Sequence, residues 1–145
     1  MLFTADEWDE MAFILKNFDA LARVNSYADE IFVDGTFHTS PTGWAQVLNV
    51  ATIIDGNTVL LYVVLMTNRK KALYNLTLSR IAQDLKDYMS VKMIHTDYEE
   101  ALMAAGEEAF TNARIVGCNF HYAQSLYRKL RKSGNTKLIR YIRTL

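Results

Sequence analysis

Cysteine and proline are almost missing from this chain, which has one of each among its 145 residues, Cys118 and Pro41. A lone thiol cannot close an internal disulfide, which excludes the small secreted domains that disulfides hold together. The longest uninterrupted apolar run, Val59 to Met66, is far too short to cross a bilayer. The N-terminus carries acidic residues where a signal peptide would have basic ones before an apolar run. We therefore expect an intracellular protein that is neither secreted nor inserted in a membrane.

Acidic residues are missing from the last part of the chain, because all sixteen lie at or before Glu108. Residues 1–108 hold eight basic residues against sixteen acidic ones, a net charge of −8, and residues 109–145 hold eight against none, a net charge of +8. Such a segment suits the phosphate backbone of nucleic acid, although a solvated helix face that balances the acidic part explains the composition equally well. The basic side chains that we expect to contact nucleic acid are Arg128, Lys129, Arg131, Lys132, Lys137, Arg140 and Arg143.

Apolar residues make up half of the chain, and aromatic residues 12%, which is ample material for the core of one compact domain. The first 30 residues are predicted to be a helical lead-in. Thr4 and Glu7 have the spacing of a capping box, and Trp8, Met11, Ile14 and Leu15 recur at helical spacing. A second short helix is expected around residues 18–27.

The pattern then changes to that of strands, predicted over 31–37, 46–54 and 58–66. Asp55-Gly56-Asn57 favours a tight hairpin between the last two of these strands. Helix-type spacing follows around 78–88, then a strand over 91–95, a helix capped by Thr96 and Glu99, a strand over 113–117 and a helix over 120–133. Residues 137–143 begin another basic helix.

This order predicts an α/β protein with a mixed sheet of five strands flanked by helices, the first three strands forming an antiparallel meander. Right-handed crossovers make the later strands parallel to the first, which is the strand order of the ribonuclease H-like fold. The expected organisation is a lead-in over residues 1–30, a core over 31–133, and the start of a further helical segment over 134–145.

Asp34 interrupts an otherwise apolar strand, where an ionised carboxylate is costly unless it is hydrogen-bonded, paired or bound to a cation. A strand-end aspartate that starts a turn with Gly35 is the simpler interpretation. Asp97 follows a strand and opens a helix, where the helix dipole favours an acidic residue whatever its function.

The two aspartates together support a more specific hypothesis. If the strands that carry them are neighbours, Asp34 and Asp97 meet at the carboxyl ends of the strands, where ligands of open α/β sheets bind. Two such carboxylates suit a hard divalent cation such as Mg²⁺ or Mn²⁺, and a pair of these ions supports phosphodiester cleavage.

Cys118 and His121 form a Cys-x-x-His pair at the start of the last predicted helix. A structural zinc site normally needs four ligands, and the chain has no second cysteine, so a complete internal zinc site is not expected. A buried thiol beside a hydrogen-bonded histidine is the better interpretation.

Three blocks of sequence in this order resemble the Mutator-like (MULE) transposase domain, over about residues 3–133. They are Asp34-Gly35-Thr36-Phe37 with Pro41, Thr96-Asp97-Tyr98-Glu99-x-Ala101, and Gly117-Cys118-x-Phe120-His121-x-x-Gln124 with Arg128-Lys129-Leu130. The resemblance implies a ribonuclease H-like catalytic core of the DDE superfamily, which cuts and joins DNA strands with Mg²⁺ or Mn²⁺ and acts in the nucleus. It makes Asp34 and Asp97 the first two catalytic, metal-binding aspartates. Glu99 matches an acidic position that is not a principal ligand, and the role of Cys118 and His121 stays open.

The chain departs from the family pattern at its end. The third catalytic residue of the family is a glutamate that follows a long helical insertion, and Leu145 falls inside the expected insertion. Residues 109–145 have no acidic residue that could take this position. We therefore expect a partial catalytic core that is inactive alone. The alternative is a non-catalytic remnant that binds nucleic acid, or one that binds a protein through Leu138, Ile139 and Tyr141, either another copy or the missing C-terminal part.

Overall fold

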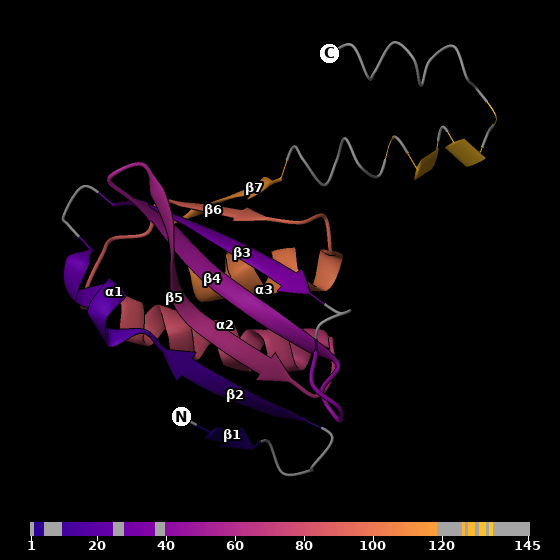
Figure 1. Ribbon diagram of the computed structural model, residues 1–145, viewed down its shortest axis with the longest axis horizontal. Coiled ribbons are helices and arrows are strands. Elements are labelled where there is room, and N and C mark those ends of the chain that lie inside the picture. The colour runs from indigo at the N-terminus through magenta and orange to yellow at the C-terminus, as the bar shows by residue number, and fades with distance from the viewer. Residues whose placement is uncertain are drawn as a thin grey trace.

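The computed structural model of this chain describes residues 2–4, 10–24, 28–36 and 40–118, and in the C-terminal part 126, 128–129, 131–132 and 134. The strands are β1 (Leu2–Thr4), β2 (Met11–Lys16), β3 (Glu30–Thr36), β4 (Gln46–Ile54), β5 (Asn57–Met66), β6 (Met93–Thr96) and β7 (Arg114–Gly117). The helices are α1 (Phe18–Arg23), α2 (Lys71–Leu85) and α3 (Glu100–Ala109). The strands form one mixed sheet in the order β1-β2-β5-β4-β3-β6-β7 (Figure 1).

The predicted meander is confirmed, since β3 pairs antiparallel with β4 and β4 pairs antiparallel with β5. Asp55 and Gly56 join β4 to β5, and both have positive φ angles, 50° and 77°. A tight primed turn needs such angles, and Gly56 adopts them without a steric penalty. The later strands also lie as predicted, with β6 parallel to β3 and β7 parallel to β6.

The helical lead-in that we predicted for the N-terminal residues is wrong. Thr4, the expected helix cap, is the last residue of β1, and Met11 to Lys16 form β2, which pairs with β5. The other capping-box residues, over 5–9, lie outside the described residues. Ala12 and Ile14 are buried while Leu15 is 49% exposed, so burial alternates as in a strand. A short run of apolar residues fits both the helical and the strand periodicity. Here pairing with the long strand β5 favours the strand. The described sheet accordingly has seven strands instead of five.

The second predicted helix is confirmed as α1, which ends at Arg23. Asn17 caps it, since the side-chain oxygen of Asn17 accepts a hydrogen bond from Ala20 N at 3.1 Å. The helix predicted over 120–133 falls mostly outside the described residues, but positions 126, 128–129 and 131–132 have helical backbone. The segment 137–143 lies outside them altogether.

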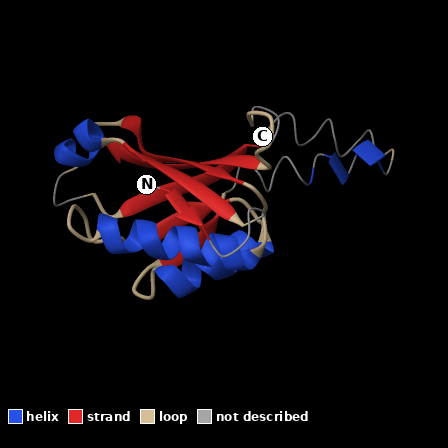
Figure 2. Ribbon diagram, turned by 90° about the horizontal axis from the view of Figure 1, so that it is seen from below, coloured by secondary structure: helices blue, strands red, loops and turns tan. Residues whose placement is uncertain are grey.

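Helices α2 and α3 lie side by side against one face of the sheet (Figure 2). Alternate strand residues point into this interface, among them the buried Val33, Leu48 and Ile94. They pack with helix residues at helical spacing, including Leu78 and Leu102. This two-layer core holds the ends of β3, β6 and β7 in a fixed register, on which the arrangement of the candidate site depends.

Candidate active site

The carboxyl ends of three adjacent parallel strands bring the predicted residues together. Val33 of β3 is in register with Thr96 of β6, and Thr96 is in register with Gly117 of β7. Asp34, Asp97 and Cys118 are the residues that directly follow Val33, Thr96 and Gly117 in the sequence. Adjacent strands lie about 4.8 Å apart, so Asp34 and Asp97 occupy neighbouring positions at one end of the sheet. The strand register confirms that the strands carrying the two aspartates are neighbours, and the convergence of their carboxylates stays a prediction.

The environment of Asp34 differs from the expectation. Its side chain is exposed, whereas Ile31 and Val33 are buried against the helices. Because successive side chains of a strand alternate between its two faces, Asp34 lies on the face opposite α2 and α3. The expected placement of this charge inside an apolar strand is thus wrong, and the metal-binding role proposed for Asp34 depends on its position beside Asp97.

Asp97 lies in a tight turn between β6 and α3 and is half-buried. Its Oδ1 accepts a hydrogen bond from the backbone N–H of Glu99 at 3.1 Å, and its carbonyl oxygen accepts one from the Thr96 hydroxyl at 2.7 Å. The predicted capping box of Thr96 and Glu99 is not formed. Glu99 itself is the N-cap residue of α3, and its side chain makes no capping bond.

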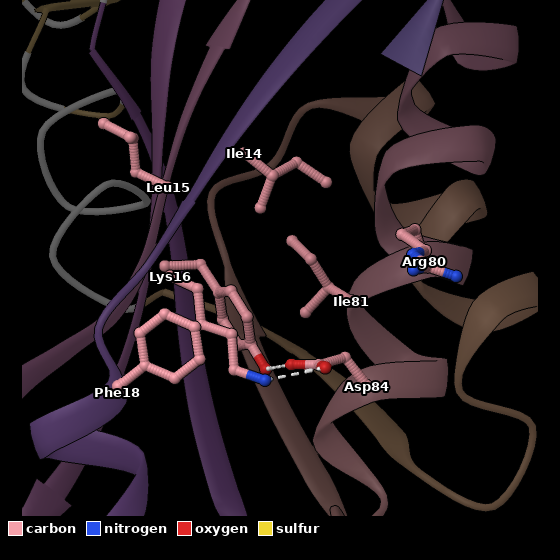
Figure 3. A pocket seen from close by; sticks show the side chains of 8 residues that line it. Ile14, Leu15, Lys16, Phe18, Arg80, Ile81 and Asp84 are labelled. Atoms are coloured by element: carbon pink, nitrogen blue, oxygen red, sulfur yellow. Dashed lines mark hydrogen bonds and ion pairs between the residues drawn. The ribbon is translucent and has the colours of Figure 1, made fainter. Parts of the chain in front are cut away.

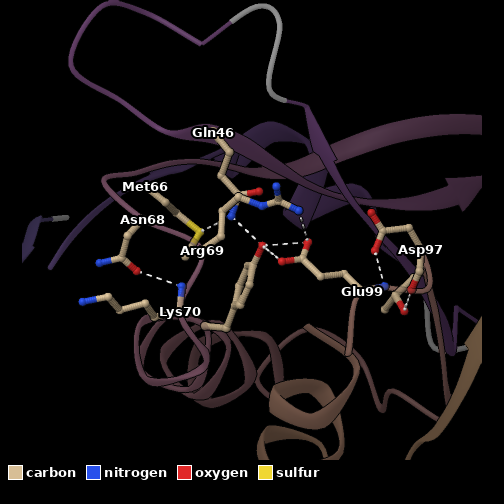
Figure 4. Close-up of polar contacts among 9 residues, drawn as sticks. Gln46, Met66, Asn68, Arg69, Lys70, Asp97 and Glu99 are labelled. Atoms are coloured by element: carbon tan, nitrogen blue, oxygen red, sulfur yellow. Dashed lines mark hydrogen bonds and ion pairs between the residues drawn. The ribbon is translucent and has the colours of Figure 1, made fainter. Parts of the chain in front are cut away.

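The Glu99 carboxylate instead takes part in a polar network between the sheet and the helices (Figure 4). Both of its oxygens accept from the Tyr74 hydroxyl at 3.1 Å, and the Arg69 guanidinium lies 3.0 Å from Oε2. The Tyr74 hydroxyl also accepts a bond from the buried Gln46 side chain at 2.7 Å. Burial, with a smaller contribution from the charge of Glu99, raises the pKa of Tyr74 to about 12, so the phenol stays protonated and donates to the carboxylate.

The contacts of His95 with Phe32 and Glu30, close to the candidate site, were not predicted from the sequence. His95 lies on β6, two residues before Asp97, and its ring stacks on Phe32 with the ring centroids 4.5 Å apart. His95 Nε2 lies 2.9 Å from Glu30 Oε2. Phe32 and His95 are paired in the parallel register of β3 and β6. Their contact could therefore have been predicted from the sequence once these two strands were assumed to be neighbours.

The donor set at this end of the sheet fits a hard divalent cation only in part. Asp34 and Asp97 offer carboxylate oxygens, which Mg²⁺ and Mn²⁺ prefer, with water as the remaining ligands. Glu99 is held by Tyr74 and Arg69 instead. Within the described part of the chain, no cluster of three or more His, Cys, Asp or Glu side chains could hold a metal ion.

The remaining predicted residues are placed less fully. Cys118 is a half-buried free thiol whose backbone N–H donates to Thr96 O at 2.6 Å, and His121 lies outside the described residues. The pairing expected for Cys118 and His121 therefore stays a prediction. The side chains of Arg128, Lys129, Arg131 and Lys132 are exposed, and Lys137, Arg140 and Arg143 lie outside the described residues.

No curated protein matches this chain. Among the helices that the structure describes, none is long and apolar enough to cross a membrane. The family model described as the MULE transposase domain matches residues 30–125, a stretch that begins at β3 and holds Asp34, Asp97, Cys118 and His121. This match covers well over half of the chain, and the chain therefore belongs to the MULE transposase domain family.

Proposed function

We propose that this chain is part of the catalytic core of a Mutator-like DNA transposase, with a ribonuclease H-like fold and metal-dependent strand cleavage and transfer as its chemistry. The observation that supports the proposal is the register of β3 and β6, in which Asp34 and Asp97 follow the last residues that pair between these two strands. The strand order β5-β4-β3-β6-β7, an antiparallel meander followed by parallel strands, supports the fold assignment.

Asp34 and Asp97 would hold Mg²⁺ or Mn²⁺ between them. The bound ion would supply Lewis-acid activation of water and stabilisation of the leaving oxygen in phosphodiester cleavage. The protein's own part is to keep two carboxylates at neighbouring strand ends. Asp34 stands on a paired strand, and Asp97 is oriented by the Glu99 N–H. No acidic residue follows Glu108, so a third carboxylate in the family's order is not supplied by residues 109–145. We expect strand transfer to require that third group.

The metal site is tested by titrating the folded protein with Mn²⁺ and following the paramagnetic broadening of backbone amides by NMR. Broadening should centre on residues 33–35 and 96–98, and Asp34→Asn or Asp97→Asn should weaken binding at least about tenfold. Asp55→Asn is the matched control, since Asp55 is an exposed aspartate in the β4–β5 turn and asparagine tolerates its positive φ angle. Equal broadening in all three variants would refute the site.

A second candidate function is nucleic-acid binding without catalysis, favoured by the charge of residues 109–145. Eight basic and no acidic residues lie there, and the four described side chains from Arg128 to Lys132 are exposed. Binding of this kind depends on counterion release and falls steeply with salt. DNA affinity that survives Asp34→Asn with and without metal would favour this function over the catalytic one.

A further inference from the structure

A polar network of Gln46, Tyr74, Arg69 and Glu99 adjoins the turn that carries Asp97. The side chain of a helix N-cap residue commonly accepts a hydrogen bond from its own helix, and that of Glu99 does not. Its carboxylate is only 18% exposed and is directed at Tyr74 and Arg69. A carboxylate drawn this far from water costs free energy unless polar contacts compensate it, and here the Tyr74 hydroxyl and the Arg69 guanidinium do so.

The hydrogen bonds of this network run in one direction. The Gln46 amide donates to the Tyr74 oxygen, and the Tyr74 hydroxyl donates to Glu99. Gln46 and Tyr74 are completely buried, and the other amide atom of Gln46, Oε1, has no partner among the described residues. Removal of the Tyr74 hydroxyl would take a hydrogen-bond partner from both the buried Gln46 amide and the Glu99 carboxylate, which is costly.

The backbone of Glu99 is tied to the candidate metal-binding residue. Its N–H donates to Asp97 Oδ1 at 3.1 Å, so the same residue that is anchored through its side chain also orients the aspartate through its main chain (Figure 4). Arg69 comes from the β5–α2 connection and Gln46 from the start of β4. The turn that carries Asp97 is therefore joined through Glu99 to three separate segments of the fold, β4, the β5–α2 connection and α2.

We propose that Glu99 and Tyr74 are positioning residues, which hold the Asp97 carboxylate in the orientation that a divalent cation needs at the end of β3 and β6. This role rests on the proposed function, because that function supplies the metal ion. The contacts that hold the Asp97 turn are present without a metal ion. Supporting contacts of this kind orient metal ligands in proteins, and their loss weakens metal affinity about 10- to 100-fold.

The chain offers a matched control at the other end of α2. There the Tyr62 hydroxyl donates to Asp84 Oδ2 at 2.6 Å and Lys16 donates to Asp84 Oδ1 at 2.8 Å, again a tyrosine, a carboxylate and a cation (Figure 3). Tyr62 is as well buried as Tyr74. Ten residues of helix separate Tyr74 from Asp84, about 15 Å along the axis. Tyr62→Phe thus makes the same chemical change without reaching Asp97.

The experiment compares Tyr74→Phe with Tyr62→Phe by two measurements. Without metal, amide hydrogen exchange at Glu99 should speed up about tenfold in Tyr74→Phe and stay unchanged in Tyr62→Phe. Tyr74→Phe should weaken Mn²⁺ binding about tenfold, whereas Tyr62→Phe should leave it unchanged. The thermal midpoints of the two variants should fall by similar amounts. Glu99→Ala should behave like Tyr74→Phe, and Glu99→Gln, which keeps an acceptor for the phenol, should recover most of the affinity.

The two proposals fail in different ways. If wild-type protein binds no Mn²⁺, the metal site is refuted, and the exchange measurement still decides whether the network holds the Asp97 turn. If wild-type protein binds Mn²⁺ and Tyr74→Phe matches Tyr62→Phe in both measurements, the network is only structural and the positioning role is overturned.

Discussion

The ring of Tyr98 lies directly on the backbone of Gly117, where there is no room for a β-carbon. Tyr98 follows Asp97 in the turn after β6, and Gly117 ends β7, so this contact holds two strand ends of the candidate site together. A side chain at position 117 would have to displace the ring of Tyr98, which is 54% exposed.

Gly117→Ala should therefore cost about 1 kcal/mol of unfolding free energy or less, because the added methyl group displaces the outer end of an aromatic ring that is 54% exposed. Chemical unfolding measures this change. Gly106→Ala is the control, since its methyl group would meet only the flexible end of Ile115 at 3.1 Å. If the collision is the cause, Tyr98→Ala should relieve most of the cost in a double-mutant cycle.

The alternation of β2 leads to a second prediction. Ile14→Ala should cost about 2–4 kcal/mol of unfolding free energy, because Ile14 packs in the core. Leu15→Ala should change it by no more than about 0.5 kcal/mol, because Leu15 is 49% exposed. In a helix with both residues on its apolar face, the two substitutions would cost similar amounts, so equal losses would contradict the strand.

Acid should weaken the contribution of Asp84. Burial alone would raise the pKa of its carboxyl, but hydrogen bonds from Lys16 and Tyr62 and the charge of Lys16 together lower it. A carboxyl with a lowered folded-state pKa stabilises the protein above its unfolded pKa, near 3.8, and this contribution is lost as the pH falls through the folded value. Asp84→Asn should cost about 1–2 kcal/mol at pH 7, allowing for partial exposure, and much less at pH 3. Denaturation at both pH values checks this, and a cost independent of pH would exclude the ion pair as its source.

Salt dependence distinguishes the basic C-terminal part from other exposed cations. If Arg128 and Lys129 contact DNA phosphates, replacing both by Gln should reduce the slope of log affinity against log salt by about 1.8. Lys86 and Lys92, also exposed, provide the matched double substitution. The same reduction in both pairs would show that only total charge matters.

Much of the central sheet could be predicted from local sequence. Strand β4 begins and ends where the pattern placed it, and Asp55-Gly56 forms the expected hairpin, because alternation and turn chemistry are properties of neighbouring residues. Asp34 was singled out as a charge in an apolar strand, whereas Asp97 depended on the family resemblance and on the predicted strand order, and the metal-binding role of both stays a prediction. The length of the chain and its charge distribution are likewise evident without a structure.

Tertiary structure decided the rest. Met11 to Lys16 became a strand because β5 offered a pairing partner, and no local pattern records that partner. The Asp34 side chain proved exposed because the helices cover the other face of the sheet. The Glu99 side chain does not form the predicted capping box, because its carboxylate contacts Tyr74 and Arg69, which are distant in sequence. Sequence by itself determined which residues could carry chemistry, since composition and spacing are local. Which face each side chain occupies and what it contacts depend on pairing between distant segments, and that is settled only when the chain folds.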